Sequence, residues 1–419
     1  MTGNANTASN WFTDAAGTTA ATIAPGDINA DNLYFNTTPG NNTGGSISTT
    51  GRLDAYSLTF NTTGYTKISG DVHIGAGGVT VNTGSGGSQI DNGGSYDTYL
   101  TTSQTWTNYS SSVLRARQLR TTGSGAITLT LDSAGTGGIN FSYIILDTTN
   151  APLTFLVDTT DKVTISKNSS TVTWRGGTII NRGELSTVES LGSGDVLLGD
   201  TSGSANAKLT MGSAYDNANN ITVRSGSSGS KTISTGGQIY GTLTLNDTLL
   251  FTSTNNAASI SGAITGTGDF VKTGDNTLTL DGSNTSTGDF TIDEGNFTLD
   301  QSGAMTFYIG ANGVNNQING ISTDSIELDG TFDFDLGGAS LVNGNSWSIV
   351  SLTASETYGS NFNITGFSET GPDLWTNGSG LTFSEMDGTL SFAVIPEPSS
   401  VVLMICGLSA FYVLRKRRK

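Results

Sequence analysis

The sequence repeats itself at a short interval between residues 260 and 300. The triplet Gly-Asp-Phe at 268–270 recurs at 288–290, and Leu278–Leu280 recurs as Phe297–Leu299. Within each unit, large apolar residues alternate with threonine, a period of two that is typical of a β-strand with one buried face. Gly-Asp, Asp-Gly and Ser-Asn pairs lie between the alternating runs and favour turns. Each unit therefore predicts two short strands joined by tight turns.

A unit of this size constrains the fold, because it cannot bury an apolar strand face by itself. Stacking the units into a solenoid solves this problem, since each coil pairs in parallel with its neighbours and inward side chains form ladders. Similar strand-and-turn runs occur at 74–81, 126–131, 196–235 and 241–245. We therefore predict an all-β chain built as a long β-solenoid.

The stretch 266–299 is similar to the autotransporter-associated β-strand repeat of bacterial surface proteins. The similar residues are Gly266-Thr-Gly-Asp-Phe-Val-Lys-Thr-Gly, Asn276-Thr-Leu-Thr-Leu-Asp-Gly-Ser-Asn-Thr and Gly295-Asn-Phe-Thr-Leu. Ser286 departs from the pattern, in which an aromatic residue is usual at this place. The resemblance implies a right-handed parallel β-helix.

Changes in residue composition and in the pattern of apolar residues divide the chain into four regions. Residues 1–45 are expected to form an N-terminal cap region, because the end of a stack must be shielded. Residues 46–305 form the solenoid. Residues 306–394 indicate a more conventional C-terminal β region, antiparallel or made of terminal rungs, that caps the solenoid. Residues 395–419 form a separate tail.

The tail combines a proline-flanked acid, an apolar run and a basic end. The first element is Pro396, Glu397 and Pro398. The second is an uncharged run of sixteen residues from 399 to 414, which spans about 24 Å as a helix and is short for a membrane span. We predict a single C-terminal transmembrane helix, anchored by Val401, Leu403, Ile405, Leu408, Phe411 and Leu414. The third element is Arg415, Lys416, Arg417, Arg418 and Lys419.

The basic end predicts the orientation of the tail, because clustered basic residues stay in the cytoplasm and leave the rest of the chain outside the inner membrane. A buried core helix with a solvated basic end is the alternative. Such a helix would be amphipathic, whereas this run is apolar all round.

In this order and at the end of the chain, the three elements resemble the PEP-CTERM sorting signal over residues 395–419. The resemblance implies that an exosortase, a membrane protease, cuts near the tripeptide and releases or transfers the ectodomain to the envelope. The implied partners are this protease and, transiently, the inner membrane. The implied location is the cell envelope, the surface or the extracellular matrix. The prolines on both sides of Glu397 keep the segment extended, a shape that a protease cleft can bind.

The N-terminus does not match this interpretation. Residues 1–6 lack a charged start and an apolar core, so that no secretory signal is visible. Because the opposite end indicates export, we expect the true start to lie upstream; a cytosolic protein is the alternative.

The charge balance excludes one class of partner. The net charge is −17, and the last five positions hold five of the 18 basic residues, which leaves 13 basic against 35 acidic groups elsewhere. Such a surface repels phosphate backbones, so nucleic acid is not an expected partner. The single cysteine, Cys406, lies in the apolar run of the tail, which excludes an intrachain disulfide and a cysteine metal site.

Few residues could carry chemistry. The only histidine, His73, follows Asp71 by two positions and is expected on the outside of a strand as a surface residue. Asp333 and Asp335 alternate with phenylalanines and share one face, as paired acids of a polysaccharide-cleaving β-helix would. A solvated acidic face is the simpler interpretation. Gly192–Leu197, with Asp195, is similar to one copy of a calcium-binding repeat, but calcium ladders need several copies. We expect no cofactor and no metal.

These observations lead to three hypotheses. The first is an exported, non-enzymatic surface or matrix protein with a structural or adhesive role. The second is a carbohydrate-active β-helix enzyme that acts on extracellular polysaccharide. The third is a carbohydrate-binding module, which exposed Trp106, Trp174 or Trp375 in a row would support.

Overall fold

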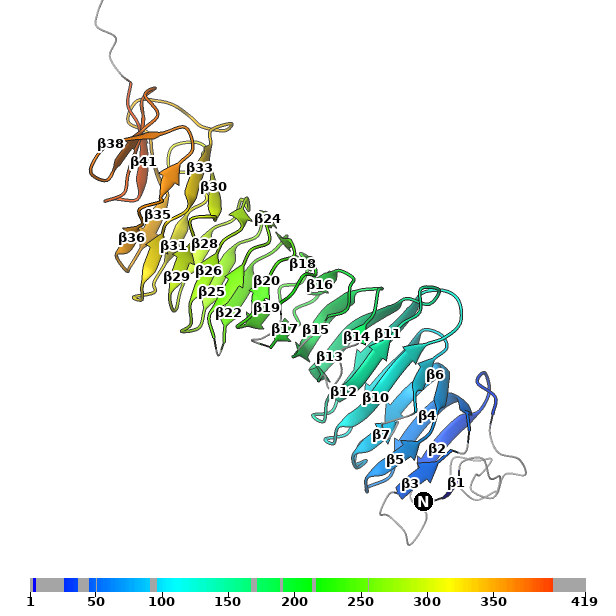
Figure 1. Cartoon of the computed structure of the whole chain (residues 1–419). Coiled ribbons are helices and arrows are strands. Elements are labelled where there is room, and N and C mark those ends of the chain that lie inside the picture. Colours follow the sequence, from blue (N-terminus) through cyan, green and yellow to red (C-terminus); the bar gives the residue numbers. More distant parts are fainter. Residues whose placement is uncertain are drawn as a thin grey trace, which may run out of the picture.

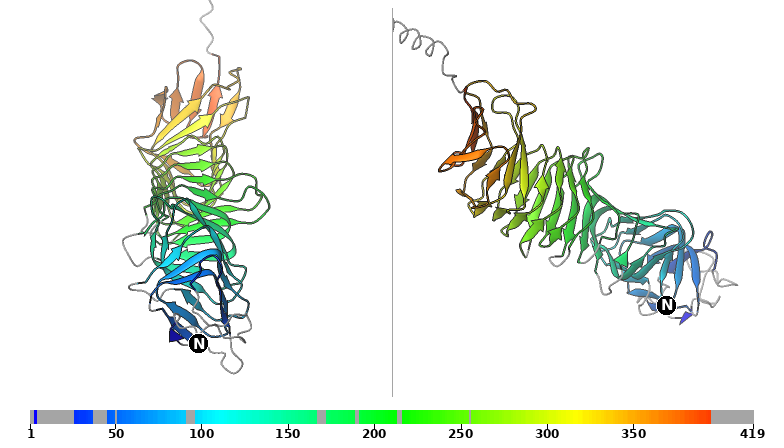
Figure 2. Two further views of the ribbon diagram at one scale, coloured as in Figure 1. Left: turned by 90° about the vertical axis from the view of Figure 1, so that its right-hand side faces the viewer. Right: turned by 45° about the horizontal axis from the view of Figure 1, so that its top comes forward.

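The structure is a computed structural model that describes residues 3–4, 26–36, 45–49, 51–90, 96–166, 172–188, 191–212, 216–254 and 256–394. These ranges contain no helix, and their strands stack into an elongated parallel β-solenoid of about eleven turns (Figures 1 and 2). Turns are joined by parallel pairing from β2 to β37. The predicted all-β solenoid is confirmed.

Thirty strands belong to one continuous parallel sheet that winds around the solenoid. Before residue 238 its strands are β1 (Gly3–Asn4), β2 (Asn32–Asn36), β3 (Gly45–Ser48), β4 (Leu53–Asn61), β5 (Thr66–Ser69), β6 (Val72–Val81), β7 (Ser88–Ile90), β8 (Thr98–Leu100), β9 (Gln104–Asn108), β10 (Leu114–Thr121), β11 (Ile127–Asp132), β12 (Ile139–Leu146), β13 (Leu153–Ile165), β14 (Val172–Thr173), β15 (Thr178–Thr187), β16 (Val196–Leu198), β17 (Ala207–Met211), β18 (Ile221–Val223) and β19 (Lys231–Thr235). After residue 238 they are β21 (Leu243–Leu245), β22 (Leu249–Ser253), β24 (Ile264–Gly266), β25 (Phe270–Thr273), β27 (Ser283–Asn284), β28 (Phe290–Ile292), β30 (Ala304–Tyr308), β31 (Ile318–Gly320), β33 (Thr331–Asp335), β35 (Val350–Leu352) and β37 (Asn363–Ile364).

A second parallel sheet begins at residue 238 and gives each later turn a third strand. Its six strands are β20 (Gln238–Ile239), β23 (Ala258–Ile260), β26 (Leu278–Leu280), β29 (Phe297–Leu299), β32 (Ile326–Leu328) and β36 (Glu356–Tyr358). From β21 onward the solenoid therefore has three faces, and the same position in successive turns lies in one column.

The repeated Gly-Asp-Phe triplet occupies the same corner in successive turns. Phe270 pairs with Phe290, and their rings stack in the core with centroids 4.6 Å apart and planes inclined by 3°. The Asp269 carboxylate accepts a hydrogen bond of 2.9 Å from the backbone N–H of Asp289. A Cβ on Gly288 would lie 2.3 Å from the carbonyl oxygen of Gly268, so that only glycine fits this approach. The phenylalanine thus packs in the core, the aspartate forms a hydrogen bond to the next turn, and the glycine allows the backbones of adjacent turns to approach closely.

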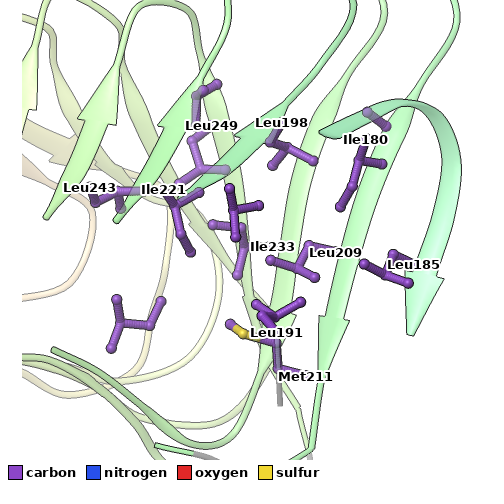
Figure 3. Close-up of a cluster of buried hydrophobic side chains, with 14 of the residues drawn as sticks. Ile180, Leu185, Leu191, Leu198, Leu209, Met211, Ile221, Ile233, Leu243 and Leu249 are labelled. Atoms are coloured by element: carbon purple, nitrogen blue, oxygen red, sulfur yellow. The ribbon is translucent and has the colours of Figure 1, made fainter. Parts of the chain in front are cut away.

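The middle of the solenoid is held together by aliphatic side chains. Leu198, Leu209, Ile221 and Ile233 come from four successive strands and are fully buried. Figure 3 shows them pointing into one interior between the faces. Because a single turn of this length could not bury them, the stacking itself creates the hydrophobic core.

One interior position of the repeat is a lysine. Lys272 on β25 is fully buried, and its Nζ donates to the carbonyl oxygens of Gly274 (2.8 Å) and Glu294 (2.6 Å). Its ammonium group therefore joins the corner of its own turn to that of the next. Burial lowers the pKa of Lys272 from 10.5 to about 8, although the nearby carboxylates of Glu294, Asp324 and Asp275 oppose the shift.

This buried ammonium predicts a pH dependence of stability. Between pH 8 and 10.5 the unfolded chain holds a proton on Lys272 that the folded chain has lost, so that the free energy of unfolding rises with pH. Between pH 7 and 10.5 the free energy of unfolding of the wild type should rise by roughly 1–3 kcal/mol more than that of Lys272→Met. Denaturant unfolding of both proteins at the two pH values measures this gain. Identical pH profiles would contradict a depressed lysine pKa.

Stacked turns continue after residue 305, in the region for which the sequence predicted terminal rungs or antiparallel strands. Parallel pairing continues through β30–β33, β31–β35, β32–β36 and β33–β37. The turns here are longer, since Ile318 pairs with Val350, whereas in the repeat Phe270 already pairs with Phe290. The sequence repeat is lost at this point, although the stacking persists.

A five-stranded antiparallel sheet lies at the C-terminal end of the described chain. Its strands are β34 (Ser346–Ser348), β38 (Ser368–Gly371), β39 (Leu374–Thr376), β40 (Leu381–Ser384) and β41 (Thr389–Phe392). Phe383 of β40 lies 6.0 Å from both Phe332 and Phe334 of β33, measured between ring centroids. The sheet thus packs on one of the last turns through aromatic side chains.

Candidate functional site

Four outward-facing side chains form a polar column on the N-terminal part of the solenoid. Asp54 of β4 pairs with His73 of β6, His73 with Tyr99 of β8, and Tyr99 with Arg120 of β10. The rings of His73 and Tyr99 stack with centroids 4.2 Å apart and planes inclined by 17°. Parallel pairing places one residue from each of four strands in register, and this produces the column.

Ionic contacts hold both ends of the column. The Arg120 guanidinium lies 2.7 Å from a carboxylate oxygen of Asp97, and the Tyr99 hydroxyl donates to the same oxygen at 3.2 Å. At the other end, Arg52 lies 2.6 Å from the Asp54 carboxylate. The charged residue at each end of the column is thus met by an opposite charge next to it.

The environment of His73 favours the neutral imidazole. Burial lowers the pKa of His73 below its usual 6.5 and Arg52 adds to this shift, while Asp54 and Asp71 oppose it. The buried Nδ1 has no hydrogen-bond partner, and one ring face lies against Tyr99. A general base needs a ring nitrogen within reach of the proton it accepts and a group that orients the ring. The column therefore supports a role in joining turns better than a role in catalysis.

The same environment predicts a loss of stability in acid. The pKa of His73 is depressed in the folded state, so its stabilising contribution is present above pH 6.5 and is lost as the pH falls through the folded value. His73 is the only histidine, so His73→Gln removes every histidine contribution. The difference in unfolding free energy between wild type and variant should shrink from pH 7.5 to pH 5. A difference that stays constant would contradict the depressed pKa.

The paired acids of β33 lie where the alternation predicts. Asp333 and Asp335 are exposed on the outer face, with Phe332 and Phe334 buried before and between them. The neighbouring positions on β30 are Thr306 and Tyr308, so the register sets no basic group beside the acids. Within the described ranges, residues 273–394 contain neither lysine nor arginine. The geometry matches a solvated acidic face.

The tryptophans do not form an exposed row. Trp106 and Trp174 are fully buried, and Trp375 is nearly so. Trp106 donates to Gln104 at 2.9 Å, and Trp174 donates to Thr178 at 3.1 Å. The structure therefore lacks, in the chain it describes, the exposed tryptophan platform that the carbohydrate-binding hypothesis needs.

The predicted calcium-like motif is an ordinary corner of a turn. Asp195 accepts a hydrogen bond of 3.2 Å from the Asn220 side chain, one turn later. Across the described part of the chain, no group of three or more histidine, cysteine, aspartate or glutamate side chains is arranged to hold a metal ion.

The sorting motif Pro396–Pro398, the membrane anchor Val401–Leu414 and the basic end Arg415–Lys419 lie outside the described residues. Within the ranges that the structure does describe, no helical segment has the length and apolar character that a bilayer crossing requires. No protein-family model, no curated protein and no solved structure matches the chain.

Proposed function

We propose that this protein is an exported, non-enzymatic surface or matrix protein. In this proposal the solenoid, wound with a right hand, is an elongated structural or adhesive element, and an exosortase-type protease processes the C-terminal tail. One observation carries the proposal: parallel pairing joins the turns without interruption from β2 to β37, and the antiparallel sheet that follows leads to a tail with the three elements of a sorting signal.

The chemistry of the outer surface supports a structural role. Polar groups on the outer surface make contacts between turns. Asp269 binds the backbone of the next turn, and Thr252 and Thr273 lie 2.8 Å apart on adjacent strands. Such contacts stabilise a rod, whereas an enzyme of this fold needs convergent acids or bases in a cleft. The polysaccharide-directed alternatives have no exposed tryptophan row to support them in the described chain.

Two tags on the full chain test the proposal in a bacterium that has an exosortase. One tag is inserted in the exposed turn 201–206 and the other follows Lys419. We expect the first tag in the envelope or the medium, on a product that lacks the second. Both tags on a single cytosolic species would refute export and processing together.

A matched variant separates processing from export. Glu397→Ala changes the tripeptide but leaves the apolar run and the basic end intact. Both tags should then stay together in the inner membrane. Normal processing of this variant would show that the protease does not read the tripeptide.

A polysaccharide panel tests the non-enzyme proposal. Depolymerisation by the wild type that disappears in Asp333→Asn and Asp335→Asn would overturn it.

A further inference from the structure

Exposed aliphatic side chains are concentrated at the C-terminal end of the described chain. Among the described residues before 310, the exposed large apolar ones are five tyrosines and one valine: Tyr34, Tyr65, Tyr96, Tyr109, Val188 and Tyr240. After residue 310 they lack polar groups altogether: Val314, Ile321, Leu341, Val342, Leu374, Met386 and Val394. An exposed tyrosine can keep its hydroxyl in water. An exposed valine or leucine has no such group, and covering it lowers the free energy of the system.

Four of these residues form what we call the tip patch: Val314, Leu341, Val342 and Val394. Their exposed fractions are 59%, 46%, 58% and 57%, respectively.

Backbone contacts bring the tip patch together from three segments. The N–H of Ser340 donates to the carbonyl oxygen of Gly310, whose own N–H donates to Val314. The N–H of Val394 donates to the Asn343 side chain at 3.0 Å. The loop that holds Leu341 and Val342 is therefore fixed between the loop of Val314 and the end of β41.

The tip patch lies where the chain leaves the solenoid. β41 lies at the end of the molecule opposite β1 (Figure 1), and Val394, two residues after β41, is the last described residue. Six residues separate it from Val401, the first membrane-anchor residue of the uncharged run 399–414. Even when fully extended, six residues span only about 20 Å. A membrane that holds the apolar run would therefore lie close to the tip patch.

Charge limits which surface could approach that membrane. Residues 273–394 contain sixteen acidic residues and no lysine or arginine. Anionic head groups therefore repel the flanks of the last turns. The uncharged tip patch is not repelled in this way, and contact with lipid would stabilise its apolar side chains.

We propose that the tip patch contacts the head-group layer of the membrane and holds the solenoid upright on it. The occupant is the bilayer interface, because the short tether brings the patch to it. The inference rests on the proposed membrane anchoring of the tail, and it adds a second, non-covalent contact next to the anchor.

A site-specific fluorophore tests the contact in the full chain reconstituted in phosphatidylcholine vesicles. Val342→Cys is labelled with a polarity-sensitive dye in a Cys406→Ser background, since Cys406 is the only native cysteine. Val188→Cys, an equally apolar site that is 45% exposed in the middle of the solenoid, is the matched control. We expect a blue shift, and quenching by a lipid-attached quencher, at position 342 and not at position 188.

Dye on native Cys406 reports separately whether the tail is inserted. An inserted tail with a fully hydrated probe at 342 overturns the tip contact and leaves the proposed anchoring intact, whereas a hydrated tail overturns both. A probe at 342 that is already shielded without vesicles shows that the tail or a second copy covers the patch, and this also overturns the proposal.

Discussion

Replacing Phe270 with alanine is expected to lower the free energy of unfolding of the central turns by about 3–5 kcal/mol. Phe270 is almost fully buried, and its ring lies between those of Phe251 and Phe290, with centroid distances of 5.4 and 4.6 Å. Alanine would leave a cavity between two flat rings that belong to different turns. Strand pairing above and below prevents these turns from moving together to fill it.

Two variants of the same strand serve as controls for this prediction. Val271→Ala removes a neighbouring side chain that faces outward, so its cost should be much smaller. Phe270→Leu keeps much of the volume and should fall between the two. Because a stacked array can open locally, amide hydrogen exchange in β22, β25 and β28 is the appropriate measurement. Equal losses in Phe270→Ala and Val271→Ala would contradict a core role for the phenylalanine column.

The repeat between 260 and 300 predicts the fold because the position of each residue, in a strand or at a corner, follows from the local sequence pattern. Alternation shows which side chains face inward, and the Gly-Asp pairs mark the corners at which one turn approaches the next. The persistence of stacking beyond residue 305 is not visible in the sequence, because the turn length changes there. Paired residues such as Ile318 and Val350 lie further apart in the sequence than Phe270 and Phe290 do. Their strands still pair in parallel, but the sequence no longer repeats at a fixed interval.

The polar column around His73 illustrates the same limit. His73 pairs with Asp54 of the preceding turn and with Tyr99 of the following turn, and the second interval along the chain is longer than the first. Because the interval changes from turn to turn, counting along the chain does not identify Tyr99 as the neighbour. Asp71, which is close to His73 in sequence, accepts the backbone N–H of Asp97 at 2.9 Å. Alternation along the strand therefore predicted the outward position of His73, but the sequence does not identify its stacking partner.

The tryptophans show that the alternation is informative outside the repeat as well. Trp106 lies between Thr105 and Thr107 on β9, and the burial pattern of that strand sends residues 104, 106 and 108 inward. Its indole packs near Phe141, with centroids 5.7 Å apart. The threonine–large residue–threonine pattern, which marks the core elsewhere in the chain, could have predicted a buried tryptophan here.

Replacing Gly266 with alanine is expected to lower the free energy of unfolding by about 2–6 kcal/mol, because it combines two separate penalties. Gly266 has a φ of +106°, a conformation that residues with a Cβ rarely adopt. Its added Cβ would also lie 2.1 Å from the carbonyl oxygen of Leu245 in the previous turn. Relief of that overlap would force apart two turns that parallel hydrogen bonds hold together.

Three other glycines separate the two penalties. Gly313 has a φ of +73° with no atom near the added Cβ, so Gly313→Ala should cost about 1–2 kcal/mol from backbone strain alone. Gly268→Ala meets the Asp247 carbonyl oxygen at 2.1 Å without a positive φ, and about 1–3 kcal/mol is expected from close approach alone. Gly371→Ala has neither penalty and should be neutral. Unfolding free energies of the four variants, measured side by side, check this order. A cost for Gly266→Ala no greater than that for Gly313→Ala would show that adjacent turns can separate without loss, which tight stacking of the turns does not allow.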